Sequence, residues 1–101
     1  MNSRSERIER ALALFEEGDA AAAGGRWRAA YDFYTAGHDL VVDSPPTHRL
    51  AHERLLRANL ALGNRGEART DRVLLALAPF GVFHLIAPFV RPTAAPEAAG
   101  E

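Results

Sequence analysis

Residues 25–40 read Gly-Arg-Trp-Arg-Ala-Ala-Tyr-Asp-Phe-Tyr-Thr-Ala-Gly-His-Asp-Leu, and this stretch decides the fold. Its large and small residues recur in steps of three and four, which is the spacing of one face of an α-helix. That face consists of Trp27, Ala30, Phe33, Tyr34, Gly37 and Leu40. Small residues between large rings let a neighbouring helix approach closely. The stretch therefore predicts a helix that packs against other helices.

The sequence before this stretch predicts a first helix. Ser5 is the expected N-cap, and apolar residues from Ile8 onward fall on one face. Gly24-Gly25 ends the helix, because glycine is favoured just after a helix C-terminus. The connection is so short that the first two helices are expected to form an antiparallel hairpin.

The sequence after the stretch predicts a second pair of helices. Pro45-Pro46 stops the preceding helix, and Thr47 is the expected N-cap of a third helix over residues 48–62. A turn and a fourth helix from Glu67 follow. The predicted fold class is therefore all-α.

Length and composition indicate a single helical domain. The chain has 101 residues, of which 48% are hydrophobic and 25% charged, and we expect one domain over residues 1–91 and a disordered tail over 92–101. A net charge of −1 gives no basic surface for nucleic acid. The absence of cysteine excludes disulfides and thiolate metal sites. The N-terminus lacks the apolar segment of a signal peptide, so a cytoplasmic location is expected.

The order of residues around Gly25 resembles the second helix of a tetratricopeptide repeat. The first unit is similar to that family at Gly18, Gly25, Trp27, Ala30, Phe33, Tyr34 and Leu40, and it departs at Glu17, Ala21 and Gly37. A second unit over residues 47–80 matches at Leu55, Gly63 and Ala68. The resemblance implies two antiparallel helix-turn-helix hairpins followed by a short C-terminal helix.

The resemblance also implies a function, namely a non-catalytic protein–protein interaction or assembly module. In that family a concave groove, lined mostly by the first helix of each pair, binds peptides or partner proteins. The outward-facing residues that would carry over are Glu16, Arg57 and Asn59. No Ser or Cys nucleophile lies beside a base, so no catalytic residue and no cofactor are expected.

The C-terminal part of the chain is unusually apolar, because residues 73–90 carry no formal charge. An uncovered apolar surface typically marks a contact with protein or membrane. We expect self-association or partner binding through Phe80, Phe83, Ile86, Phe89 and Val90. One alternative is an internal cap on the open end of the helix stack. Another is membrane attachment through residues 79–90, although Pro79 and Pro88 disfavour a continuous span.

His48 and His52 are four residues apart on the predicted third helix. This spacing places two imidazoles on one helix face, as a divalent metal site requires. The order His-x-x-x-His-Glu differs from the His-Glu-x-x-His of zinc proteases. His38 and Asp43 are the residues that could approach as a third ligand, but the sequence identifies neither. We therefore interpret the pair as surface histidines, with a metal-binding helical protein as the weaker alternative.

Overall fold

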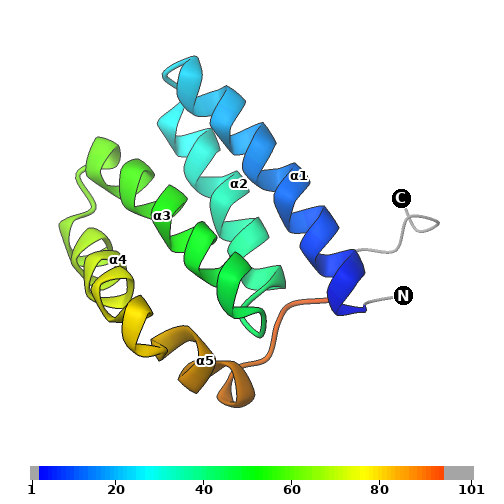
Figure 1. Cartoon of the computed structure of the whole chain (residues 1–101). Coiled ribbons are helices and arrows are strands. Elements are labelled where there is room, and N and C mark those ends of the chain that lie inside the picture. Colours follow the sequence, from blue (N-terminus) through cyan, green and yellow to red (C-terminus); the bar gives the residue numbers. More distant parts are fainter. Residues whose placement is uncertain (1–2, 95–101) are drawn as a thin grey trace.

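The computed structural model describes residues 3–94, and over this range it is all-α without strands (Figure 1). The predicted fold class is confirmed. The helices are α1 (Arg4–Ala23), α2 (Trp27–Leu40), α3 (Pro45–Leu62), α4 (Arg65–Leu77) and α5 (Val82–Ile86), with single 3₁₀ turns at Ala78–Phe80 and Ala87–Phe89.

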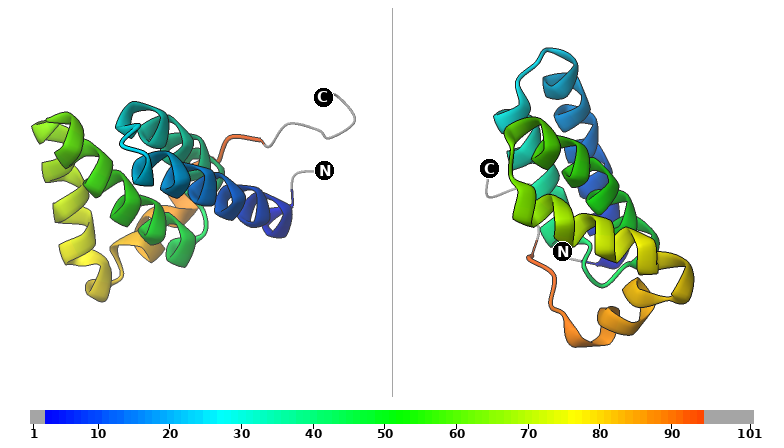
Figure 2. Two further views of the ribbon diagram at one scale, coloured as in Figure 1. Left: turned by 90° about the horizontal axis from the view of Figure 1, so that it is seen from above. Right: turned by 90° about the vertical axis from the view of Figure 1, so that its left-hand side faces the viewer.

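The first four helices follow one another in space, each packed beside the one before it (Figures 1 and 2). Helix α3 is central, because it contacts α1, α2, α4 and α5. Helix α5 lies across the end of the molecule where α3 begins (Figure 1). The chain then returns along α2, where the Thr93 backbone N–H donates to the Asp39 carbonyl at 2.7 Å. Residues 95–101, most of the predicted disordered tail, lie outside the described range.

The packing of α1 against α2 depends on two glycines that face aromatic rings. A Cβ atom at Gly37 would lie 2.5 Å from the Phe15 ring, and one at Gly18 would overlap the Tyr34 ring. Tyr34 is fully buried, and its hydroxyl donates to Asp19 at 2.6 Å. The prediction that residues 25–40 form a closely packed helix is therefore confirmed.

Three predicted helix starts are wrong, and one of them is that of α4, which begins at Arg65 rather than Glu67. Helix α1 is capped by Ser3 rather than Ser5, because Ser3 and Glu6 form a reciprocal capping box in which each side chain accepts the other's backbone N–H. Helix α3 begins at Pro45, and Thr47 lies inside it rather than at its N-cap. Proline suits the first turn of a helix, where its missing N–H has no intrahelical partner in any case.

The C-terminal segment is divided between buried and exposed side chains. Phe83 is buried, contrary to the prediction that it forms part of a surface. Ile86 and Val90 are half-buried, whereas Phe80 and Phe89 are 85% and 83% exposed. Among the described residues, no single helix is long and apolar enough to cross a membrane. One pair, Arg65–Phe80 and Val82–Phe89, passes that test jointly but is bent by 98°.

Candidate metal centre

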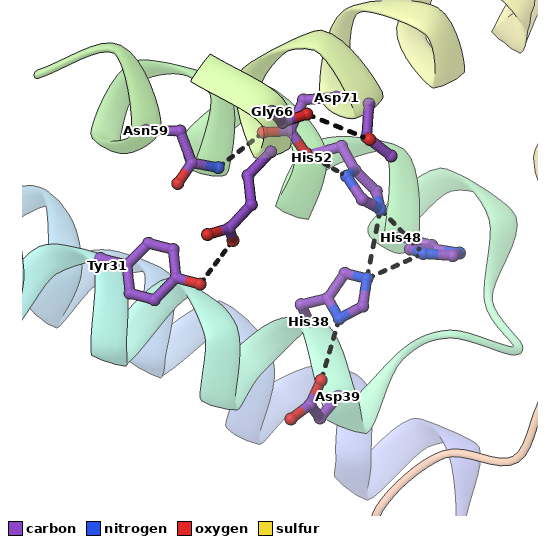
Figure 3. A network of polar contacts seen from close by, with 10 residues as sticks. Tyr31, His38, Asp39, His48, His52, Asn59, Gly66 and Asp71 are labelled. Atoms are coloured by element: carbon purple, nitrogen blue, oxygen red, sulfur yellow. Dashed lines mark hydrogen bonds and ion pairs between the residues drawn. The ribbon is translucent and has the colours of Figure 1, made fainter. Parts of the chain in front are cut away.

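Three histidines converge on one point between α2 and α3 (Figure 3). His38 lies in the last turn of α2, and His48 and His52 lie on successive turns of α3. The Nε2 atoms of His38 and His48 are 3.0 Å apart, and each is 3.2 Å from Nε2 of His52. No other group of three metal-binding side chains gathers in this way within residues 3–94.

The interpretation of His48 and His52 as surface residues is wrong, since their exposed fractions are 4% and 8%. The short connection between α2 and α3 places the first two turns of α3 against the end of α2. On another side, the Phe83 ring of α5 lies 4.9 Å from the His48 ring and 5.7 Å from the His52 ring. Half-buried His38 completes the cluster.

Carboxylates fix the tautomers of two of the three rings. Asp71 accepts from Nδ1 of His52 at 2.7 Å, and Asp39 accepts from Nδ1 of His38 at 3.0 Å. In a neutral imidazole the proton then resides on Nδ1, and Nε2 presents a lone pair. The two Nε2 lone pairs therefore face each other at 3.2 Å without a proton between them. We assign these tautomers from the hydrogen-bond partners.

Asp71 is itself held in place from the opposite side. Its second carboxylate oxygen accepts from the Asn59 side-chain amide at 2.8 Å, and Asn59 accepts from Asn64 at 3.1 Å. Asn59 is only 1% exposed, so the expectation that it faces outward is wrong. Asn59 faces inward, and there its side-chain amide orients the buried carboxylate of Asp71. The fixed carboxylate in turn orients the imidazole of His52.

The rings of His38 and His48 are neutral near pH 7, because the pKa of each lies below its ordinary value of 6.5. Burial lowers the pKa of His48 to about 3, and the nearby imidazoles of His38 and His52 act in the same direction. Burial also lowers the pKa of His38, against the opposing effect of Asp39. A backbone hydrogen bond from the His48 ring to Val42 opposes this lowering of the His48 pKa but is the smallest of the effects. Neutral imidazole is the form that binds metal ions.

The geometry of the three nitrogens suits a tetrahedral metal ion. His38, His48 and His52 would hold such an ion through their Nε2 atoms, as three-histidine zinc sites do. Carboxylates bonded to the outer nitrogens of the ligand rings are the usual second layer of such sites. The arrangement can thus hold an ion through three protein ligands.

The other residues considered from the sequence lie elsewhere. Asp43 does not approach the histidines, because both of its carboxylate oxygens accept from the Arg7 guanidinium, at 2.8 and 3.1 Å. Glu16 and Arg57 are exposed on α1 and α3, and Arg57 lies 3.5 Å from Asp19. These side chains do not form one site with Phe80 and the exposed apolar residues of the C-terminal segment.

A cavity of about 270 Å³ adjoins the histidines between α2, α3 and α4. His38 and His52 form part of its wall, together with Thr35. Tyr31 and Glu67 also line it, and the Tyr31 hydroxyl donates to the Glu67 carboxylate at 2.6 Å. The candidate metal centre therefore borders a space that other molecules can occupy.

Comparison of the chain with known protein families, curated proteins and solved structures found no match. The assignment of the centre therefore depends on its geometry. Sequence spacing identified His48 and His52, but His38 was only one of two possible third ligands. Asp71 gave no signal in the sequence, because it joins the site only through the packing of α4 on α3.

Proposed function

We propose that the protein binds a divalent transition metal ion, zinc above all, through the Nε2 atoms of His38, His48 and His52. The observation that carries this proposal is the convergence of the three Nε2 atoms within 3.0–3.2 Å of one another. The Nε2 atoms of His38 and His52 are both acceptors in the tautomers that Asp39 and Asp71 favour, and their lone pairs repel one another at 3.2 Å. A cation bonded to all three converts that repulsion into coordination.

The donor set favours zinc over the common hard cations. Imidazole nitrogen suits zinc, copper, nickel and iron, whereas magnesium and calcium prefer oxygen ligands. Zinc accepts a tetrahedral arrangement with three histidines. Asp39 and Asp71, the partners of the outer nitrogens, contribute two negative charges close to a doubly charged ion. Their charges offset much of the cost of burying that ion.

Calorimetric titration of the metal-free protein with zinc tests the proposal. We expect one ion per chain, and a loss of binding in the variants His38→Gln, His48→Gln and His52→Gln. His84→Gln is the matched control, because His84 is the remaining histidine of the chain and is exposed on α5. Circular dichroism establishes that each variant is folded. Zinc binding that is equally strong in a folded His38→Gln variant would contradict the proposal.

A second candidate function is a non-catalytic interaction module of the tetratricopeptide type. Its support is the similarity of the two helix pairs. Gly25 and Gly63 occupy the connections within the pairs at φ values of 77° and 76°. A buried alanine follows each glycine by five residues: Ala30 follows Gly25, and Ala68 follows Gly63. This recurrence is what two copies of one structural repeat would produce.

The exposed apolar side chains Phe80, Leu85 and Phe89 support self-association or binding of a protein partner by such a module. Sedimentation over a hundredfold range of concentration tests for self-association. We expect Phe89→Glu to shift an oligomer toward monomer without loss of helix content. A strictly monomeric chain that binds lipid vesicles would favour membrane attachment through residues 79–90 instead.

A further inference from the structure

Residues 82–93, which we call the returning segment, cover one side of the proposed metal centre. The Phe83 ring lies edge-on to the His48 ring, with 4.9 Å between centroids, and 5.7 Å from the His52 ring. Aromatic rings attract one another in such arrangements. Phe83 is 2% exposed, and it is the only buried residue of this segment. The buried side chain that attaches the segment to the helices therefore packs on two of the proposed ligands.

The far end of the returning segment contacts the protein beside the third ligand. The Thr93 backbone N–H donates to the Asp39 backbone carbonyl at 2.7 Å. Asp39 lies in the last turn of α2, where backbone carbonyls lack partners within the helix. Its side chain accepts from Nδ1 of His38. The hydrogen bond from Thr93 therefore holds the residue that orients His38.

The returning segment depends on these contacts for its position. Its helix, α5, has five residues, which is too short to be stable without packing. Gly81 precedes α5 with φ 84°, and glycines at element ends can absorb the backbone rotation that a separation requires. Leu85 and Phe89 face solvent, with exposed fractions of 70% and 83%. A segment with so few buried contacts opens at low free energy, and its attachment decides where these two apolar side chains lie.

We propose that attachment of the returning segment and binding of the metal ion are coupled, so that each stabilises the other. This inference rests on the proposed metal-binding function. Without the ion, the Nε2 lone pairs of His38 and His52 repel one another at 3.2 Å, which disfavours the ring positions that Phe83 packs on. An ion bonded to the rings removes the repulsion and fixes them. By linkage, the attached segment then raises zinc affinity by the same factor by which zinc favours attachment.

The exchange rate of the Thr93 amide proton measures attachment, because that proton forms the hydrogen bond to Asp39. Nuclear magnetic resonance of the full-length protein with and without zinc gives this rate. We expect saturating zinc to slow the exchange at least about fivefold, the lower end of typical coupling between two sites. His38→Gln should abolish the slowing, because it removes a ligand but keeps the two rings that Phe83 contacts.

Two matched pairs of variants measure the reciprocal effect on zinc affinity. Thr93→Pro removes the N–H that donates to Asp39, whereas Thr93→Ala keeps it. Phe83→Leu removes the ring that packs on the histidines, whereas Phe80→Leu changes a ring that is 85% exposed. In calorimetric titration we expect Thr93→Pro and Phe83→Leu each to weaken zinc binding at least about fivefold. The two control variants should bind zinc as the unmodified protein does, and circular dichroism establishes that all four are folded.

The outcomes separate this inference from the function on which it rests. Thr93 exchange that zinc slows, with weaker zinc binding in Thr93→Pro and Phe83→Leu, supports both. Zinc binding that leaves Thr93 exchange unchanged overturns the coupling and leaves the metal site intact. Equal zinc affinity in Thr93→Pro and Thr93→Ala overturns the role of the hydrogen bond to Asp39. A folded, unmodified protein that binds no zinc overturns both proposals.

Discussion

At the scale of single residues, the proposed centre depends on groups that never touch the metal ion. Asp71 holds the imidazole of His52 at 2.7 Å and is in turn held by Asn59 at 2.8 Å. This chain of hydrogen bonds crosses from α3 to α4 and back. It fixes both the orientation of the ring and the nitrogen that carries the proton.

The first prediction concerns Asp71. Asp71→Asn keeps the size of the side chain but removes the charge that stabilises the Nδ1–H tautomer of His52. We expect zinc affinity to fall about 10- to 100-fold while all three ligands are retained. Competition against a chelator measures the change. Asp32→Asn is the control, because Asp32 is exposed on α2 and distant from the site, and its effect on affinity should be negligible.

The second prediction concerns the ion pair between Arg7 and Asp43, which connects α1 to the loop after α2. The hydrogen bond from Arg7 holds the pKa of Asp43 below its ordinary value of 3.8. The unfolded chain therefore takes up a proton on Asp43 more readily than the folded chain does. The stabilisation that the ion pair gives to the folded chain is therefore fully present above about pH 4, the pKa of Asp43 in the unfolded chain. It is lost as the pH falls through the lower pKa of Asp43 in the folded chain.

Asp43→Asn isolates this contribution, because the histidines are common to both proteins. We expect the variant to be less stable than the unmodified protein by about 1–3 kcal/mol near pH 6. The difference should shrink as the pH falls toward about 3. Urea unfolding at several pH values measures it. A difference that stays constant across this range would mean that the charge of Asp43 has no part in stability.

Residue patterns predicted some of these features and not others. The i,i+4 spacing identified the pair His48 and His52, since that relation is local to one helix. The contribution of His38 needs the packing of α2 on α3, and that of Asp71 needs the packing of α4 on α3. Contacts between different helices leave no periodic pattern in the sequence from which they could be predicted. The burial of Asn59 was missed for the same reason, because its partner lies on another helix.

At the scale of elements, the spacing of apolar residues predicts the helices. The residues that cap each helix determine its boundaries. The face of α2 was predictable because rings and small residues alternate along it. The starts of α1 and α3 were misplaced by a few residues, because more than one residue near each start can serve as a cap. Ser3 competes with Ser5, and Pro45 is as suitable within the first turn as Thr47 is before it.

The third prediction compares two glycines that lie inside helices. Gly37→Ala on α2 places a methyl group against the Phe15 ring and should destabilise the protein by about 1–3 kcal/mol. Gly66→Ala on α4 meets no atom within 4 Å and should stabilise it by up to about 1 kcal/mol through helix propensity. Thermal unfolding of the two variants measures both effects. The same sign in both would show that α2 does not pack on α1 through Gly37.

At the scale of the whole molecule, the proposed metal site joins elements that are distant in the sequence. Its ligands come from α2 and α3, its second layer includes Asp71 from α4, and the Phe83 ring of α5 lies against two of the ligand rings. A bound ion would thus connect α2 to α3, with α4 and the C-terminal segment packed around it. The core around Tyr34, by contrast, lies mainly between α1 and α2.

The fourth prediction follows from this arrangement. An ion that binds the folded chain through residues on two helices stabilises it by RT ln(1 + [L]/Kd), about 2.7 kcal/mol when free zinc is a hundred times Kd. For a domain of this size, that corresponds to a rise of roughly 10–20 °C in the unfolding midpoint. Calorimetry with and without zinc measures the shift. His48→Gln should abolish it, whereas exposed His84→Gln should retain it. Hydrogen exchange then locates the effect: we expect the largest added protection in α2 and α3, which supply the ligands, and the smallest in α1, which supplies none. An equal rise in all helices would instead mean that the amides exchange through unfolding of the whole chain, and that the centre does not add local protection to α2 and α3.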